Sequence, residues 1–267
     1  MNDKYTHIKP NVHCGMCGYI WQVIQGIFHN PDKKYYIDFA GSIYKTNNTD
    51  NVWDYFFKQP HTNTKPDAQF IEKEVGRIQD PASEYVWGNI VPNTTEEIQK
   101  RRLVFSKIIK DYCVLQNNTQ HIVDLFVEQH FKNKRVLGVH LRGTDHPHKK
   151  PIHEYLRIIK EKLIDYDVLF VCSDDNERFV LAETMFSEKV VSYNALRSFA
   201  SNTPLHCCIH NPMYQRNNSF EYQHKIAEDV IVEAFLMSKV DFLMCCPDSN
   251  VNMLARAINP TLSSMSL

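Results

Sequence analysis

Features that mark several common protein classes are missing from this sequence of 267 residues. No apolar run approaches the ~20 residues that a helix needs to cross a bilayer. The polar beginning lacks the apolar core of a signal peptide. The formal net charge is −1, so the chain also lacks the excess of lysine and arginine that favours nucleic acid or an anionic membrane. We therefore expect a soluble, cytoplasmic protein with no membrane span and no nucleic-acid partner.

Metal-ligand spacings are scarce as well. Cys14 and Cys17 form a Cys-X-X-Cys pair with His13 beside it, but no second pair follows. A structural zinc site usually needs four such ligands. A disulfide between the two cysteines, or two buried thiols, are the other interpretations. The eight cysteines occur without a secretory signal, so we expect most of them to be free.

The clearest positive signal is a short apolar strand with a polar end. Val136–Val139 is followed by His140, Arg142, Thr144 and Asp145. Alternation along a strand places His140 and Arg142 on the same side. An arginine fixed at the end of a buried strand suits an anionic ligand, because its planar fork binds two phosphate oxygens and stays charged. The alternative is an arginine–aspartate pair that closes a surface loop.

Strand, polar loop and helix alternate after this point. The elements that we expect are a helix at 152–164, a strand at 167–172, a helix at 177–186, a strand at 190–192, a helix at 221–238, a strand at 241–245 and a helix at 251–258. This alternation predicts an open parallel α/β sheet, in which ligands bind outside the carboxyl ends of the strands. The polar clusters 140–145, 173–176 and 248–250 all fall at such ends.

The first half of the chain carries weaker signals. Gly15 and Gly18 allow a tight turn, and helical spacing follows from Tyr19, so amides at the start of a helix could face an anion. The other expected elements are a strand at 34–39, an aromatic core segment at 51–57, mainly loops over 61–95, and helices at 96–115 and 121–131 joined by a connection at 117–120.

In this order, the clusters resemble the GDP-fucose-dependent fucosyltransferases, especially the α1,6- and O-fucosyltransferase-like superfamily. The family motif His-X-Arg-X-Thr-Asp matches His140–Asp145, and a strand ending in Ser/Thr-Asp-Asp matches Ser173–Asp175. A later Ser-Ser-Asn/Gln-Val motif matches Asp248–Val251, with aspartate in the first place. The Cys14–Gly18 loop also resembles the N-terminal loop of the α1,6 enzymes.

The resemblance implies a GT-B-like α/β fold of two Rossmann-like halves with a cleft between them. Residues 1–130 would form the acceptor-side domain, and residues 131–267 the domain that binds the nucleotide sugar. The implied activity is an inverting transfer of a sugar, L-fucose from GDP-fucose, to a glycan hydroxyl without a cofactor or bound metal. The partners are then a nucleotide sugar and a glycan, in a bacterial or viral-host cytoplasm rather than the Golgi.

The resemblance also implies roles for individual residues. Arg142 would hold the β-phosphate and act in catalysis together with Asp145. The residues implied to bind or support the donor are His140, Arg142, Asp174, Asp175, Glu233, Ser249, Asn250, Gly15 and Gly18. The implied absence of a metal agrees with the sequence, because the only Asp-X-Asp triplet, at 165–167, precedes a strand instead of following one.

Three departures leave alternatives open. Many α1,6 members carry a second arginine where this chain has Gly143, His146 replaces a lysine, and Glu233 stands at a position that is usually aspartate. The donor could then be another nucleotide sugar such as UDP-xylose. The carboxylate expected as general base is replaced by Lys150, which also keeps a catalytically idle binding module as an alternative. The remaining candidates for the base are Asp145, His146, His148, Glu154 and Asp38.

Overall fold

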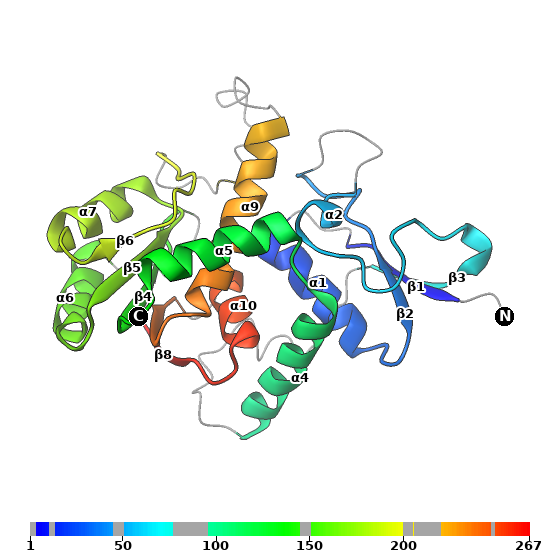
Figure 1. Ribbon diagram of the computed structural model, residues 1–267, viewed down its shortest axis with the longest axis horizontal. Coiled ribbons are helices and arrows are strands. Elements are labelled where there is room, and N and C mark those ends of the chain that lie inside the picture. The colour runs from blue at the N-terminus through cyan, green and yellow to red at the C-terminus, as the bar shows by residue number, and fades with distance from the viewer. Residues whose placement is uncertain are drawn as a thin grey trace.

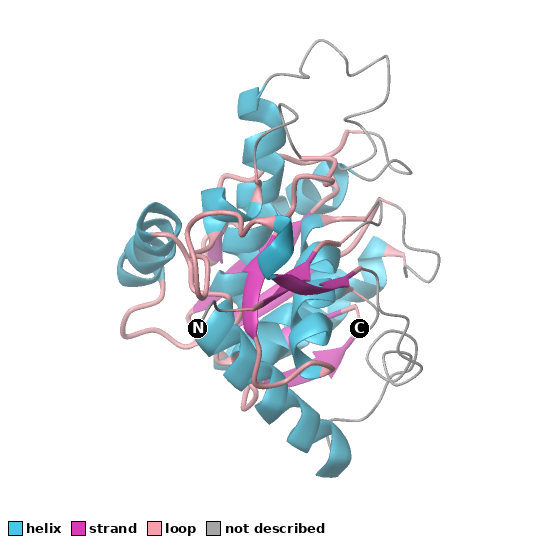
Figure 2. Ribbon diagram, turned by 90° about the vertical axis from the view of Figure 1, so that its right-hand side faces the viewer, coloured by secondary structure: helices cyan, strands magenta, loops and turns pink. Residues whose placement is uncertain are grey.

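The computed structural model describes residues 4–10, 14–44, 51–76, 96–144, 151–199, 205, 220–246 and 249–267. Within these ranges the chain forms two parallel β-sheets, one of three strands and one of five. Helices lie between the two sheets and over the outer face of the larger one (Figure 1). Seen from the side of the smaller sheet, the strands lie near the centre of the view, with helices around and behind them (Figure 2). Among the described helices, none is long and apolar enough to cross a membrane.

The smaller sheet has the order β2-β1-β3. Its strands are β1 (Tyr5–Ile8), β2 (Lys34–Ile37) and β3 (Ile71–Val75). Helix α1 (Met16–Phe28) connects β1 to β2. Ile8 of β1 packs against Gly26 of this helix, where a larger side chain would contact the isoleucine at about 3.2 Å. The glycine therefore lets α1 lie close to the sheet.

The expectation of loops over 61–95 is wrong at β3, and β1 was not expected at all. The strand β3 reads Ile-Glu-Lys-Glu-Val, and its three central charged side chains are exposed. An edge strand of this kind has no continuous apolar run, so its sequence resembles a loop. Residues 77–95 lie outside the described part of the chain.

The larger sheet has the order β6-β5-β4-β7-β8, with β4 at its centre. Its strands are β4 (Val136–Leu141), β5 (Val168–Ser173), β6 (Val190–Val191), β7 (Phe242–Cys245) and β8 (Ser263–Ser266). All neighbouring pairs are parallel. The predicted open parallel sheet is therefore confirmed, with β8 as an additional edge strand.

Helices cover both faces of this sheet. On one face Leu137 and Val139 pack with Tyr155 of α6 (Ile152–Lys162) and Phe179 of α7 (Asn176–Phe186). The helix α6 is followed by the short η2 (Leu163–Asp165). The opposite face packs against α5 (Asn117–His130), α9 (Phe220–Met237) and α10 (Asn250–Ile258). Because side chains alternate along β4, His140 points to the same face as α9 and α10.

One hydrophobic core continues from this second face into the smaller sheet, through α1 and α4 (Glu96–Tyr112). The remaining elements are α2 (Trp53–Phe56) and η1 (Ala68–Phe70). Trp53 and Phe56 are fully buried, as expected for a core segment. The helix connection lies at 113–116 rather than at 117–120, because Gln116 donates side-chain hydrogen bonds to the carbonyls of Asp54 and Phe57.

Candidate functional site

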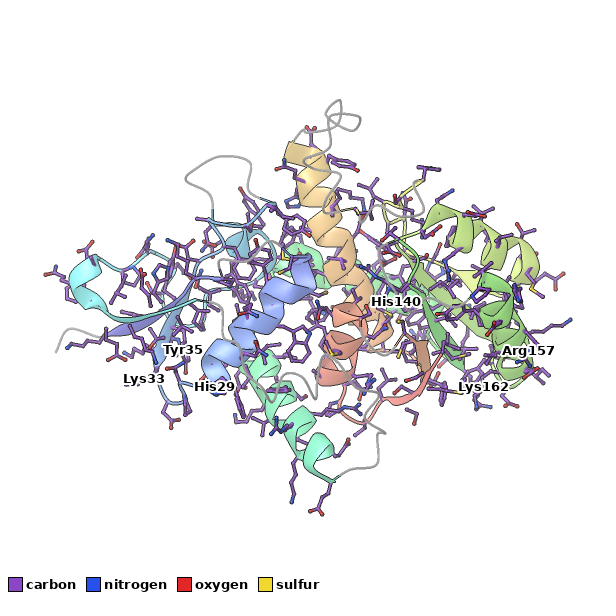
Figure 3. All side chains as sticks on the ribbon, turned by 180° about the vertical axis from the view of Figure 1, so that it is seen from behind. His29, Lys33, Tyr35, His140, Arg157 and Lys162 are labelled. Atoms are coloured by element: carbon purple, nitrogen blue, oxygen red, sulfur yellow. The ribbon has the colours of Figure 1, made fainter. Side chains whose placement is uncertain are left out.

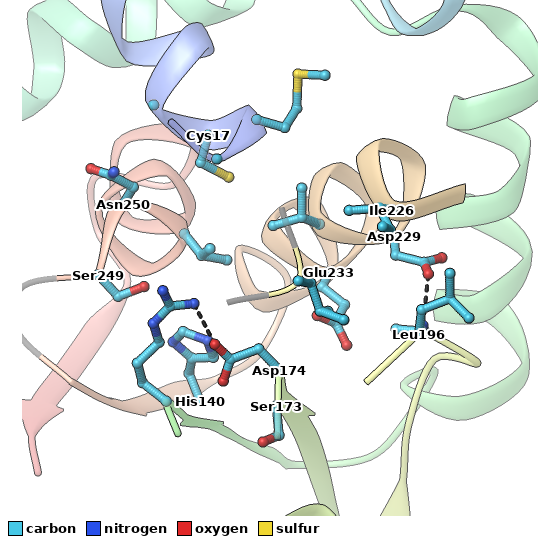
Figure 4. A pocket seen from close by; sticks show the side chains of 18 of the residues that line it. Cys17, His140, Ser173, Asp174, Leu196, Ile226, Asp229, Glu233, Ser249 and Asn250 are labelled. Carbon is cyan, nitrogen blue, oxygen red and sulfur yellow. Dashed lines mark hydrogen bonds and ion pairs between the residues drawn. The ribbon is translucent and has the colours of Figure 1, made fainter. Parts of the chain in front are cut away.

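A cavity of about 400 Å³ opens where the carboxyl ends of β4 and β5 meet the beginnings of α1 and α10. The wall opposite the α10 start is formed by α9 and by the loop after β6 (Figure 4). The cavity is lined by Cys14, Gly15, Met16, Cys17, Gly18, Tyr44, His140, Arg142, Ser173, Asp174, Ala195, Leu196, Leu205, Ile226, Asp229, Val230, Glu233, Ser249, Asn250 and Val251. Residues far apart in the sequence therefore share one cavity.

The centre of the cavity is an ion pair between Arg142 and Asp174. Arg142 follows β4, and its Nη1 atom lies 2.6 Å from Oδ2 of Asp174, which follows β5 (Figure 4). Since β4 and β5 are parallel neighbours, their ends bring the two side chains together. Only 22% of the arginine side chain is exposed, so the guanidinium is fixed in a partly desolvated position. A fixed, partly desolvated cation suits binding of an anionic group.

Asp174 also organises the chain after β4. Its Oδ1 accepts a hydrogen bond from the backbone N–H of Gly143 at 2.9 Å, and its Oδ2 accepts one from Thr144 Oγ1 at 2.6 Å. Burial alone would raise the pKa of this carboxyl, but Arg142 and these hydrogen bonds lower it below its ordinary value. Asp174 therefore stays ionised and holds Arg142 in place.

The beginning of α10 faces the same part of the cavity. Ser249 is the N-cap residue, and its side chain makes no capping hydrogen bond, while Asn250 is the first helical residue. Free amides at a helix start, together with the helix dipole, favour an anion. Figure 4 shows Ser249 and Asn250 on one side of Asp174 and His140, and Glu233 and Leu196 on the other. We call the part of the cavity beside Arg142 and the start of α10 the anion end. The part beside Glu233 and Leu196 is the second end.

Helix α1 meets α10 at the anion end. Gly18 lies in the first turn of α1, and a Cβ atom there would come within 2.6 Å of Cys14 Sγ and 3.6 Å of Asn250 Nδ2. Trp21 Nε1 donates a hydrogen bond to the backbone carbonyl of Asn250 at 3.2 Å. Position 18 requires a glycine because a side chain there would collide with Cys14, and not because the chain makes a tight turn. Gly15 is the N-cap residue of the helix.

Neither cysteine of this loop forms a disulfide, so the disulfide interpretation is not realised in this structure. Both line the cavity. Burial raises the pKa of the Cys17 thiol, and the nearby Cys14 raises it further by a smaller amount. No group of three or more side chains that could hold a metal ion occurs among the described residues, and His13 lies outside them.

The second end of the cavity is built by α9 and the loop after β6. Asp229 Oδ2 accepts a hydrogen bond from the backbone N–H of Leu196 at 2.8 Å (Figure 4). Lys225 forms an ion pair with the same carboxyl. Leu196, Ile226 and Val230 give this end an apolar lining. One turn after Asp229, Glu233 is 8% exposed and also lines the cavity. An apolar slot with a carboxyl at its edge suits a flat heterocycle with hydrogen-bond donors.

The structure brings together His140, Arg142, Asp174, Glu233, Ser249, Asn250, Gly15 and Gly18 in this cavity. His140 is 3% exposed, and Figure 3 places it in the interior between the two sheets, whereas Arg157 points outward. Asp175 turns away from the cavity: its Oδ1 accepts the backbone N–H of Arg178 at 3.2 Å, so it caps α7. Asp145 lies outside the described residues.

The other residues proposed as general base are either outside the described residues or away from the cavity. His146 and His148, like Lys150, lie outside the described residues. Glu154 is in the first turn of α6 and does not belong to the described cavity lining. Asp38 is 2% exposed and contacts His7 Nε2 at 3.1 Å and Lys65 Nζ at 3.3 Å. Burial would raise the pKa of Asp38, but the His7 and Lys65 contacts lower it, so this carboxylate is a poor proton acceptor.

Several cavity residues were not found from the sequence, among them Asp229, Tyr44 and Leu196. Asp229 could have been found, since it precedes Glu233 by four residues and therefore shares its helix face. Tyr44 lines the cavity and accepts a hydrogen bond from the backbone N–H of Met16 at 3.0 Å. Leu196 belongs to a loop without a periodic pattern. Neither of these two carries a sequence signal.

The fold is therefore an α/β fold with a cavity at the carboxyl ends of a parallel sheet, where a fixed arginine and a helix start suit an anionic group. No family model matches the chain, and no curated protein sequence matches it. Among solved structures, the NodZ α1,6-fucosyltransferase soaked with GDP-fucose has a TM-score of 0.58 at 15% identity, and the match covers 97% of this chain and 93% of that chain. A second structure of NodZ, from Bradyrhizobium, has a TM-score of 0.57 at 15% identity, with 96% and 93% covered.

The Arabidopsis thaliana FUT1 mutant R284K in complex with GDP has a TM-score of 0.58 at 11% identity. That match covers 100% of this chain and 71% of the plant chain. These likenesses establish the fold, which is the GT-B-like α/β fold of the fucosyltransferases. The resemblance expected from the sequence motifs is therefore confirmed at the level of the fold.

Proposed function

We propose that this chain is an inverting glycosyltransferase that moves L-fucose from GDP-fucose to a glycan hydroxyl. The observation that carries the proposal is Arg142, held by Asp174 beside the start of α10, in a fold shared with a protein soaked with GDP-fucose. The donor would lie along the cavity, with its diphosphate at the Arg142 end and its base at the Glu233 end. His140 would lie against the base or ribose.

The chemistry follows from this placement. In the transfer, the bond between the sugar C1 and the β-phosphate oxygen breaks, and a bond forms between C1 and the acceptor oxygen from the opposite side. Negative charge builds up on the departing diphosphate. The guanidinium of Arg142 and the amides at the start of α10 stabilise that charge in a partly dry site, and these groups make a metal unnecessary for the step. The proposed reaction therefore uses no cofactor.

The acceptor hydroxyl must also lose a proton to a general base. We retain Asp145 as a candidate, since it follows Thr144, whose hydroxyl is bound to Asp174, the partner of Arg142. The carboxylates of Asp174 and Asp175 are both engaged in positioning, the first on Arg142 and the second on α7. We assign residues 131–267 to donor binding and residues 1–130 to the acceptor side.

The proposal is tested by a thermal-shift panel of GDP, UDP, GDP-fucose and UDP-xylose. A ligand at 100 times its Kd stabilises the folded state by about 2.7 kcal/mol. We expect GDP and GDP-fucose to raise Tm in the parent protein and not in Arg142→Ala. The matched control is Arg157→Ala, an exposed arginine on the far side of α6 (Figure 3). No shift with any of the four ligands would contradict the proposal.

Binding must then be followed by turnover. Release of GDP from GDP-fucose, by hydrolysis in water or transfer to a mixed glycan acceptor, separates an enzyme from a binding module. We expect release that depends on Arg142. A protein that binds GDP-fucose but releases no GDP under either condition would instead be a binding module.

A further inference from the structure

The carboxyl of Glu233 is placed unlike the other acidic groups of the cavity. Asp174 is paired with Arg142, and Asp229 is paired with Lys225. Glu233 forms no ion pair among the described residues, and its Oε1 atom has no hydrogen-bond partner among them. The group is only 8% exposed, yet it lines the cavity. A buried carboxyl that lines a cavity and keeps one oxygen without a partner among the described residues is placed to bind a ligand.

The surroundings of Glu233 favour its neutral form. The titratable and charged groups that face it are Lys225 and Asp229 of α9, Cys172 of β5, Asp174 directly after β5, Cys17 of α1, and Arg197 of the loop after β6. His140 and Arg142 complete the charged lining of the cavity.

The nearby cations are engaged elsewhere, which leaves burial as the dominant effect. Arg197 donates hydrogen bonds to the carbonyls of Ala195 and Tyr193 and lies over the ring of Phe179. Burial raises the pKa of Glu233 to about 8, and Asp229 and Asp174 add to the rise, while Arg197 opposes it. The Cys172 thiol is hydrogen-bonded to the Glu233 side chain, and a thiol brings no charge that would ionise it.

The two forms of this carboxyl match different heterocycles. An ionised carboxylate only accepts hydrogen bonds, whereas the neutral acid has one donor and one acceptor. Guanine presents two adjacent donors, N1–H and the N2 amino group, and these fit a carboxylate. Uracil presents an N3–H donor flanked by carbonyl oxygens, which fit the neutral acid. A buried polar group without a hydrogen-bond partner lowers the binding free energy considerably. The protonation state of Glu233 therefore decides whether the cavity prefers guanine or uracil.

We propose that Glu233 is a neutral acid in the free protein, and that a guanine nucleotide binds with release of the Glu233 proton while a uracil nucleotide binds the neutral form. This inference rests on the proposed function only in placing a nucleotide in the cavity. The proton released from the carboxyl passes to the solvent buffer, and the resulting carboxylate is satisfied by the two guanine donors. Base preference then depends on pH: acid favours uracil, and alkali favours guanine.

Isothermal titration calorimetry of GDP and UDP tests the proposal. At pH 7, each titration is run in two buffers with different ionisation enthalpies, because the difference counts the protons released. We expect about one more proton released with GDP than with UDP. Between pH 6 and pH 8, the ratio of GDP affinity to UDP affinity should rise by up to tenfold per pH unit. Ionisation of the diphosphate is common to both nucleotides and cancels in the ratio.

The variant Glu233→Gln carries a donor and an acceptor permanently. It should bind UDP as the parent does, bind GDP at least tenfold more weakly, and lose the extra proton. Glu221→Gln, an exposed position in the first turn of the same helix, is the matched control and should leave all three measurements unchanged. An equal proton count for GDP and UDP in the parent would overturn the inference and leave the proposed function standing. Failure of both nucleotides to bind would overturn both.

Discussion

Asp175 occupies the space that a side chain at Gly143 would need. A Cβ atom built on Gly143 would lie 2.3 Å from the Cβ of Asp175 and 2.4 Å from its Oδ2. Asp175 is fixed there because it caps α7, and the N–H of Gly143 is bound to the neighbouring Asp174. In this structure the contact leaves no room for the second arginine that the sequence resemblance would place at position 143. Capping of α7 and a side chain at position 143 exclude each other.

The first prediction concerns this contact. Gly143→Arg should not add a phosphate ligand, and Gly143→Ala should lower the free energy of unfolding by about 2 kcal/mol, a typical cost of overpacking. Urea denaturation measures the change. Gly41→Ala is the control, because its Cβ would meet only the carbonyl of Pro10 at 3.9 Å. The double variant Gly143→Ala/Asp175→Gly should recover part of the loss, and strictly additive effects would contradict the contact.

The second prediction concerns the cation of the cavity. Arg142→Ala should lower kcat for sugar transfer by 10²–10³-fold, about 3–4 kcal/mol, as expected when one preorganised charge at the leaving group is removed. Arg142→Lys should recover only part of the rate, because an ammonium cannot bind two oxygens in a plane. Steady-state kinetics with the donor varied measures both variants. Activity of Arg142→Ala within a few-fold of the parent would contradict its role.

The third prediction uses the raised pKa of Glu233. The pKa is about 8 in the folded protein, against an ordinary value of 4.5, so the folded state binds more protons than the unfolded state between these pH values. Stability from this group is present below pH 4.5 and is lost as the pH rises toward 8. Glu233→Gln should therefore raise the free energy of unfolding at pH 7 by about 3 kcal/mol. Denaturant titrations at pH 4.5 and pH 7 measure the difference, which should vanish at the lower pH.

The fourth prediction separates Asp38 from catalysis. Its pKa is lowered in the folded protein, so its contribution to stability is present above its ordinary value of 3.8 and is lost as the pH falls through the folded-state pKa. Asp38→Asn should reduce the free energy of unfolding at pH 7 by about 3 kcal/mol, because it removes one partner of a buried pair. It should leave kcat within a few-fold of the parent. A hundredfold loss of kcat in a protein that is still folded would restore Asp38 as the base.

The sequence predicted the part of this molecule in which local pattern and global fold agree. Continuous apolar strands such as 168–172, each followed by a polar loop and a helix, are enough to place Arg142 and Asp174 at one sheet edge. The strands β1, β3 and β8 were missed, because short or edge strands with polar side chains depend on their neighbours for stability rather than on an apolar run. Of the α9 residues that line the cavity, the sequence predicted only Glu233.

Two details depended on three-dimensional contacts that no spacing contains. Asp174 and Asp175 are adjacent and chemically identical, yet one holds Arg142 and the other caps α7, because successive side chains point in different directions at the end of β5. Asp229 binds the backbone N–H of Leu196, and Lys225 and Arg197 bind the carbonyls of the two preceding residues. A loop that is held by such contacts between side chains and backbone has no periodic signal.

The hydrogen bond between Trp21 and the carbonyl of Asn250 gives the molecule an optical probe of its own. Indole emission depends on the polarity and hydrogen bonding around Nε1, and this Nε1 is bound to the residue that begins the proposed phosphate-binding helix. Trp53, in contrast, is stacked on Phe57 and does not belong to the described lining of the cavity. We therefore expect occupation of the cavity to change the emission of Trp21 in the unlabelled protein.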